Sequence, residues 1–155
     1  MNHHHVQATA LASFTAYGEP KGQPRARAFA MGRGKVRMYD PGTAEGWKSQ
    51  IAHAAQDFIP PTPHQGPLLL TLCFLFPRPK AHFRANGLLK ETAPLWVEKK
   101  PDIDNAAKAV MDALTMLGMW DDDKQVASVS MLKRYIMNDE RAGCEITIAT
   151  LSPNE

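Results

Sequence analysis

Cysteine is scarce in this chain, with only Cys73 and Cys144 among 155 residues. Both stand in apolar, strand-like runs, and neither belongs to a Cys-x-x-Cys or Cys/His spacing, which argues against a disulfide scaffold and a thiolate zinc site. The most apolar stretch, Pro67–Phe76, is about half the length of a membrane-spanning helix. The first residues also lack the basic and apolar segments of a signal peptide. We therefore expect two free thiols, a cytoplasmic location and no membrane partner.

Acidic residues are absent from the whole range Pro20–Tyr39. The basic residues of this range are Lys21, Arg25, Arg27, Arg33, Lys35 and Arg37. The acids gather instead between Asp102 and Asp123, where six of them accompany one base, Lys108. A basic surface beside an acidic cluster is typical of proteins that bind a polyanion and use metal ions in their chemistry. Scattered, solvated surface charge is the alternative for the basic residues.

Apolar periodicity and turn residues predict strands and helices in irregular alternation. The expected strands are Val6–Tyr17, Pro67–Phe76, Val126–Ile136 and Glu145–Leu151, with a hairpin of Ala26–Met31 and Lys35–Tyr39. The expected helices are Thr43–Phe58 and Ala106–Leu117. We therefore predict an α+β (mixed) fold in which a mixed sheet carries two main helices. One compact domain over residues 1–155 is expected, with residues 1–5 disordered or derived from a tag.

Two segments of this pattern carry more specific expectations. Pro67–Phe76 is almost continuously apolar and lies between prolines, so we expect a central strand that is buried on both faces. Arg78–Lys99 has no clear period and contains several bases, so we expect a long mobile loop. Long loops in compact domains tend to be functional.

The acids stand at both ends of the second predicted helix. Asp102 and Asp104 come just before it, and in extended backbone their side chains would point to the same side, about 6.5 Å apart. Lys108 lies one helical turn beyond Asp104. Asp121–Asp123 follow the helix. These later acids could lie near the helix start only if the next strand runs back alongside the helix.

Convergence of three carboxylates would be costly without a counter-charge. At about 4 Å and an effective dielectric near 20, each pair of like charges costs about 4 kcal/mol. Hard oxygen ligands of this kind suit Mg²⁺ or Mn²⁺ rather than zinc. Such a metal activates water against a phosphodiester, and Lys108 would offset charge on the phosphate. The structural alternatives are a helix cap, a solvated turn, and for Asp112 a pair with Lys108 or with the backbone.

Two segments, KPDIDNAAKAVMDAL and GMWDDDKQV, resemble the RusA family of Holliday junction resolvases of bacteria and their phages. The family pattern falls here on Asp102, Asp104, Asn105, Lys108, Asp112, Gly118, Trp120, Asp122, Asp123, Gln125 and Val126. The upstream segments GEPKGQPRAR and RMYDP extend the likeness over most of the chain.

The resemblance implies a homodimeric, Mg²⁺-dependent endonuclease of DNA recombination and repair, in which Mn²⁺ is expected to substitute. It would cut four-way junction DNA by paired symmetric nicks. The implied catalytic residues are Asp102, Asp104, Lys108 and Asp123, and the implied metal ligands are Asp102, Asp104 and Asp123, with Asp122 as an alternate. The DNA-binding residues would be Lys21, Arg25, Arg27, Arg33, Lys35, Arg37 and Lys100. Since Asp121–Asp123 is one acid longer than the usual family pattern, the identity of the third ligand stays open.

Two other functions fit the same residues. Pro101-Asp102 followed by Asp122-Asp123-Lys124 satisfies the PD…(D/E)xK pattern of other metal nucleases, which would make Lys124 catalytic. A non-catalytic, architectural junction-binding protein would bind DNA with a strong salt dependence and would need no metal.

Overall fold

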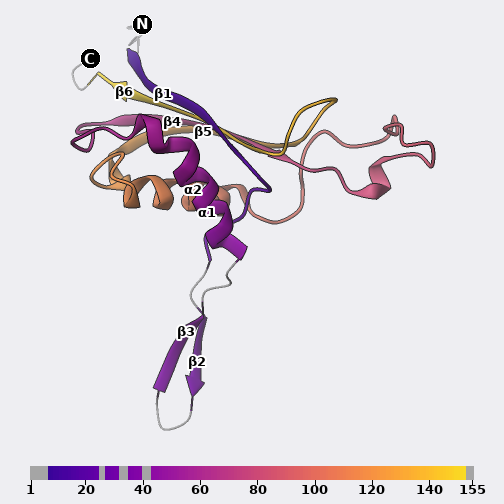
Figure 1. Ribbon diagram of the computed structural model, residues 1–155, viewed down its shortest axis with the longest axis horizontal. Helices are drawn as coiled ribbons and strands as arrows, with labels where there is room; N and C mark the ends of the chain where they lie inside the picture. Colours follow the sequence, from indigo (N-terminus) through magenta and orange to yellow (C-terminus); the bar gives the residue numbers. More distant parts are fainter. Residues whose placement is uncertain (1–6, 25–26, 32–34, 40–42, 153–155) are drawn as a thin grey trace, which may run out of the picture.

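The computed structural model describes residues 7–24, 27–31, 35–39 and 43–152, and for residues 27–31, 35–39 and 43 it describes the backbone alone. Within these ranges one sheet has the strand order β1-β6-β4-β5, and β2 and β3 form a separate hairpin (Figure 1). The strands are β1 (Ala8–Tyr17), β2 (Arg27–Met31), β3 (Lys35–Tyr39), β4 (Leu68–Phe76), β5 (Val126–Tyr135) and β6 (Gly143–Leu151). The helices are α1 (Thr43–Ala55) and α2 (Ile103–Met116), with 3₁₀ turns η1 (Gln56–Phe58), η2 (Lys80–His82) and η3 (Asp123–Gln125).

The sheet is mixed, as predicted. β6 pairs antiparallel with β1 and with β4, whereas β4 and β5 are parallel. A parallel pair needs a crossover connection, and here the crossover consists of a long loop, Pro77–Lys100, followed by α2. α2 therefore begins at the carboxyl ends of β4 and β5 and runs back toward their starts. This confirms the α+β prediction of a mixed sheet with two helices.

Both helices pack on one face of the sheet (Figure 1). The core between these layers contains the buried side chains of Trp47, Ile51, Leu70, Phe74, Val110, Leu114, Trp120 and Ile146. On β4 the buried positions Leu68, Leu70 and Leu72 alternate with more exposed ones. Since burial of one such side chain contributes about 2 kcal/mol, this layer holds α2, and with it the acids at both ends of α2, against the sheet.

The second face of the sheet corrects two expectations. β4 is not buried on both faces, because Thr71 is exposed and Cys73 is half-buried on the side away from the helices. Phe58, expected on the apolar face of the first helix, is 41% exposed and stacks on Phe14 with ring centroids 5.3 Å apart.

Both cysteines are free, and burial raises the pKa of each thiol. None of the helices in the described ranges combines the length and apolarity needed to cross a membrane.

The segment expected to be a long mobile loop contains some local structure. η2 lies near its beginning, and two isolated β-bridges join Phe83 to Leu89 and Trp96 to Arg134. The second bridge attaches the end of the loop to the outer edge of β5. The loop extends away from the sheet and returns to it just before α2 (Figure 1).

Candidate functional site

The start of α2 presents two carboxylates. Asp102 is the N-cap residue, with extended backbone (φ −60°, ψ 144°), and its side chain makes no capping hydrogen bond. Asp104 lies in the first turn, and both residues are exposed. The partial positive charge of a helix N-terminus favours anions here. Among the described residues neither carboxylate has a hydrogen-bond or ion-pair partner, so their oxygens are available for a ligand. The helix begins three residues earlier than the sequence predicted.

Three neighbouring segments fix the backbone around these acids. The Lys133 ammonium group at the end of β5 donates to the carbonyl oxygens of Lys99 and Pro101, both at 2.8 Å. The backbone amide of Gln23 donates to the carbonyl oxygen of Asn105 at 3.1 Å. As a result the loop before α2, the end of β5 and the segment after β1 all meet at the helix start.

Lys108 lies exposed on α2, one turn beyond Asp104. The expected pair between Asp112 and Lys108 is wrong, because Asp112 accepts from the Lys48 ammonium at 2.7 Å and from the Gln23 side chain at 3.4 Å. Among the residues that the structure describes, Lys108 makes no ion pair. Its charge therefore remains available on the same side of the helix start as Asp104.

The acids after α2 have different surroundings. Asp121 accepts a hydrogen bond from the Gln65 side chain. Asp122 caps η3 by accepting from the Lys124 amide at 2.9 Å, and this hydrogen bond is the main cause of a lowered pKa for the Asp122 carboxyl. Within the described ranges the Asp123 carboxylate accepts no hydrogen bond from a backbone amide or from an Asn, Gln or Lys side chain. Asp123 is half-buried and shares a side-chain hydrogen bond with Asp122, which further lowers the pKa of the Asp122 carboxyl.

Within one chain, Asp102 and Asp104 do not come together with Asp121–Asp123. β5 runs back alongside α2, as the sequence argument required, but the residue that it brings to the helix start is Lys133. Asp121–Asp123 remain at the opposite end of α2, which has 14 residues and is therefore about 21 Å long. In the described part of the chain, no group of three or more His, Cys, Asp or Glu side chains is close enough to hold a metal ion.

A cavity of about 280 Å³ lies beside the helix start. Its walls include Phe76 and Tyr135, the last residues of β4 and β5, together with Arg78, Lys99 and Lys100. Sheets with parallel strands commonly bind ligands at the carboxyl ends of those strands. Three bases and one acid, Glu19, line the cavity, so its lining is basic on balance, and it adjoins the segment that leads into Asp102.

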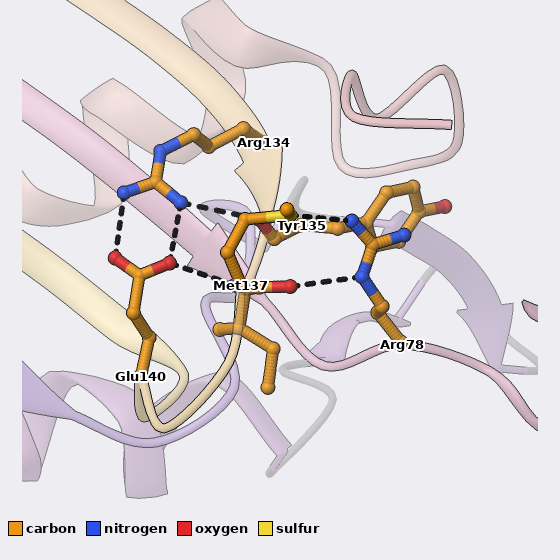
Figure 2. Close-up of polar contacts among 6 residues, drawn as sticks. Arg78, Arg134, Tyr135, Met137 and Glu140 are labelled. Atoms are coloured by element: carbon orange, nitrogen blue, oxygen red, sulfur yellow. Dashed lines mark hydrogen bonds and ion pairs between the residues drawn. The ribbon is translucent and has the colours of Figure 1, made fainter. Parts of the chain in front are cut away.

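A polar network lies next to this cavity and shares Arg78 and Tyr135 with its walls (Figure 2). Arg134 and Glu140 form two parallel hydrogen bonds of 2.7 Å, and the Met137 amide donates to the same carboxylate at 2.7 Å. The bonds from Arg134 lower the pKa of Glu140 to about 2, and the amide contributes further. Arg78 donates to the carbonyl oxygen of Ile136 at 2.8 Å, so the beginning of the loop is joined to the turn after β5.

The structure describes the candidate DNA-binding residues to different extents. Arg25 and Arg33 lie outside the described residues, and for Arg27, Lys35 and Arg37 only the backbone of β2 and β3 is described. Lys21 forms an exposed pair with Glu19 at 3.6 Å, and Lys100 is exposed on the cavity rim. Their role in DNA binding stays a prediction.

Sequence reasoning missed several residues that arrange the site, chiefly Lys133, Gln23, Lys48 and Arg78. No local pattern marks them, because each acts on a partner that is distant in sequence. Lys133 does not stand out in the sequence either, because β5 (VASVSMLKRY) mixes polar and apolar residues along its length.

Comparison with known proteins adds two findings. The family model for endodeoxyribonuclease RusA matches residues 17–149. The uncharacterized protein YqaN of Bacillus subtilis (strain 168) is 34% identical over 147 residues, which cover 90% of this chain and 96% of YqaN. The matched range contains both helices, both acidic groups and the long loop.

Proposed function

The chain belongs to the RusA family of endodeoxyribonucleases, and from this premise we propose that it is a Mg²⁺-dependent enzyme that resolves four-way DNA junctions. It would introduce paired symmetric nicks during DNA recombination and repair. The observation that carries this proposal is the start of α2, where two uncommitted carboxylates, Asp102 and Asp104, lie beside a basic cavity. A phosphodiester backbone is attracted by the bases, and the acids supply the ligands that a catalytic metal needs.

The donor set fits Mg²⁺. Asp102 and Asp104 offer only carboxylate oxygens and are exposed, and proteins commonly hold Mg²⁺ with one or two carboxylates plus waters and substrate phosphates. A bound Mg²⁺ would supply an activated water and would stabilise the leaving oxygen. Mn²⁺, which favours the same ligands, would substitute. Lys108 would offset charge that develops on the attacked phosphate.

The basic hairpin would hold the DNA next to these acids. The segment Gly18–Pro24 connects β1 to the hairpin, and its Gln23 amide bonds to the carbonyl oxygen of Asn105 in the first turn of α2. The arm formed by β2 and β3 therefore departs from the site itself. Contacts from its Lys and Arg residues to phosphates would position the DNA without reading its sequence.

A homodimer would complete the metal site with a third carboxylate. β5 is an outer strand, and the part Val126–Leu132 exposes Val129, Met131 and Leu132 to solvent. An unpaired apolar strand edge is a ready surface for a second chain. Two such edges pairing antiparallel about a dyad would bring Asp123 of one copy toward Lys133 and the helix start of the other. A dyad also suits symmetric cuts in two like strands.

The decisive experiment uses an end-labelled synthetic four-way junction and a linear duplex of the same sequence, each with Mg²⁺ or with EDTA. We expect paired nicks only with the junction and Mg²⁺. Asp104→Asn should abolish cutting and preserve junction binding, because it removes a metal ligand and leaves the basic surface intact. Asp57→Asn, at an exposed aspartate in η1, is the matched control and should cut normally. Tight junction binding by the wild type without any nicks would favour the architectural alternative.

A second comparison separates this family mechanism from the PD-(D/E)xK alternative. Lys108→Ala should reduce the cutting rate by at least 100-fold, since a charge that stabilises the transition state is worth several kcal/mol. Lys124→Ala, at the opposite end of α2, should cut at close to the wild-type rate. Rates are measured with saturating junction. Loss of cutting in Lys124→Ala alone would contradict the assignment of Lys108.

A further inference from the structure

The three tryptophans of this chain are exposed to very different degrees. Trp47 and Trp120 are buried, with 3% and 1% of their surface exposed, whereas Trp96 is 55% exposed. An indole is among the largest side chains and normally lies in a core or an interface. A tryptophan left in solvent therefore indicates a surface that is covered in a complex.

The backbone around Trp96 is held firmly. The Tyr135 amide donates to the carbonyl oxygen of Leu95 at 2.8 Å, and the Val97 amide donates to that of Lys133 at 3.4 Å. One residue further back, the carbonyl oxygen of Pro94 accepts from the Arg78 guanidinium at 2.7 Å. An aromatic ring on a fixed backbone loses little conformational entropy when a partner binds.

The charge around Trp96 favours nucleic acid as that partner. The loop Pro77–Lys100 contains six basic residues, Arg78, Lys80, Arg84, Lys90, Lys99 and Lys100. Its only acids are Glu91 and Glu98. Two further apolar side chains of the loop, Phe83 and Leu88, are 37% and 61% exposed. Exposed aromatic rings among basic residues are typical of surfaces that bind unpaired nucleotides.

The position of Trp96 relates it to the acids. Lys99 and Lys100 follow it directly, and Lys133, adjacent to its bridge partner Arg134 on β5, donates to the carbonyl oxygens of Lys99 and Pro101. A single strand that contacts Trp96 and then the two lysines therefore leads toward Asp102. The edge strand, the loop end and the helix start form one continuous path.

We propose that Trp96 is a stacking platform for one base left unpaired at the branch point of a DNA junction, with Lys99 and Lys100 on the adjoining phosphates. This proposal rests on the proposed function, because that function supplies the branched DNA. The competing occupant is a second copy of the chain. Two copies of this basic loop would repel each other, so the charge favours DNA.

Intrinsic fluorescence tests the proposal, because Trp96 is the exposed indole while the other two are buried. Wild-type protein in EDTA is titrated with a four-way junction and with linear duplex at the same salt concentration. Stacking should quench the emission with the junction more than with the duplex. Trp96→Leu should lose the quench and weaken junction binding about tenfold, and Trp96→Phe should recover most of that affinity. Tyr17→Leu, at an exposed aromatic residue outside the loop, should bind normally.

The outcomes separate this proposal from the function on which it rests. Junction binding and Mg²⁺-dependent nicking with unchanged emission, and normal binding by Trp96→Leu, would overturn the stacking role alone. Absence of any preference for the junction in wild type would overturn both. Emission that changes with protein concentration in the absence of DNA, together with a monomeric Trp96→Leu variant, would assign Trp96 to the contact between copies and overturn the DNA role.

Discussion

Single polar side chains with several partners determine the geometry around both acidic groups. At the end of α2, the Gln125 side chain accepts from the amides of Asp121 and Asp122 and donates to the carbonyl oxygens of His64 and Gly66. At the other end, Lys133 donates to two carbonyl oxygens. These hydrogen bonds are exposed or part-buried, so each contributes modestly, on the order of 1 kcal/mol, but together they join backbone segments that are distant in sequence.

Glu140 supports a prediction about acid stability. Its pKa is lowered from 4.5 to about 2 by the bonds from Arg134, so this pair stabilises the fold above pH 4.5 and the contribution is lost as the pH falls toward 2. Because the pair is partly exposed, we expect about 1 kcal/mol rather than the full shift. Glu140→Gln should lower the free energy of unfolding by that amount at pH 7 in urea titrations.

The pH profile supplies the check. Between pH 4.5 and 2 the difference in unfolding free energy between wild type and Glu140→Gln should shrink. Glu98→Gln, in which the exposed acid takes part in no ion pair of the described residues, should leave stability unchanged. If wild type and Glu140→Gln differ equally in unfolding free energy at pH 7 and near pH 2, Arg134 does not act through the charge of Glu140.

The spacing of apolar residues predicted the helices and strands well, and the places where it failed have physical causes. The two helices and the strands lie close to where the pattern predicts, and buried residues recur at helix spacing in α2 and at strand spacing in the first half of β4. The pattern could not tell which face of β4 lacks a covering helix, since Leu69 and Cys73 are apolar yet only half-buried. It also placed the start of α2 at Ala106 rather than Ile103, because polar residues in a first turn resemble a loop.

Gly22 supports a prediction about how the segment after β1 meets α2. A Cβ at this position would lie 3.1 Å from the Pro101 Cβ and closer still to the Asn105 side chain. Overpacking of this kind costs about 1–3 kcal/mol. Gly22→Ala should therefore lower the melting temperature and the cutting rate together, because it pushes the segment that carries the hairpin away from the helix start.

The control for this change is another glycine. Gly46 lies in α1 with no atom within 4 Å of its would-be Cβ, so Gly46→Ala should raise stability by up to about 1 kcal/mol. Its cutting rate should stay unchanged. Normal melting and cutting by Gly22→Ala would mean that the contact with α2 is dispensable.

At the scale of the whole molecule, the sequence located the acids but not their separation. Asp102 and Asp123 read as one motif, yet α2 lies between them with its full length. The separation follows from the helix between them, because Asp121–Asp123 come directly after α2 and the returning strand β5 brings only a later residue, Lys133, to the helix start. That one domain spans residues 1–155 stays a prediction, as does the homodimer.

Met131 supports a test of that dimer. It is 37% exposed on the outer strand β5, and a charge there would oppose the pairing of two edges. Met131→Asp should therefore be a folded monomer by light scattering and should not cut junctions. Met116→Asp, at a 79% exposed methionine at the end of α2, is the control and should remain dimeric.

A mixture of two inactive variants then tests whether the copies share sites. Asp104→Asn mixed with Asp123→Asn should regain cutting as single, unpaired nicks, because one of the two shared sites in a mixed dimer keeps both acids. If the mixture contains mixed dimers but does not cut the junction, each copy carries its own complete site.

The pairing of β1 affects how the protein folds during synthesis. β1 pairs only with β6 in the described sheet, and Ala8 lies opposite Leu151. During synthesis β1 therefore lacks its sheet partner on either edge until β6, far later in the sequence, has left the ribosome. Contacts between such distant residues slow folding and prolong exposure to aggregation. Newly made chains should accordingly depend on chaperones more than the size of the protein would suggest.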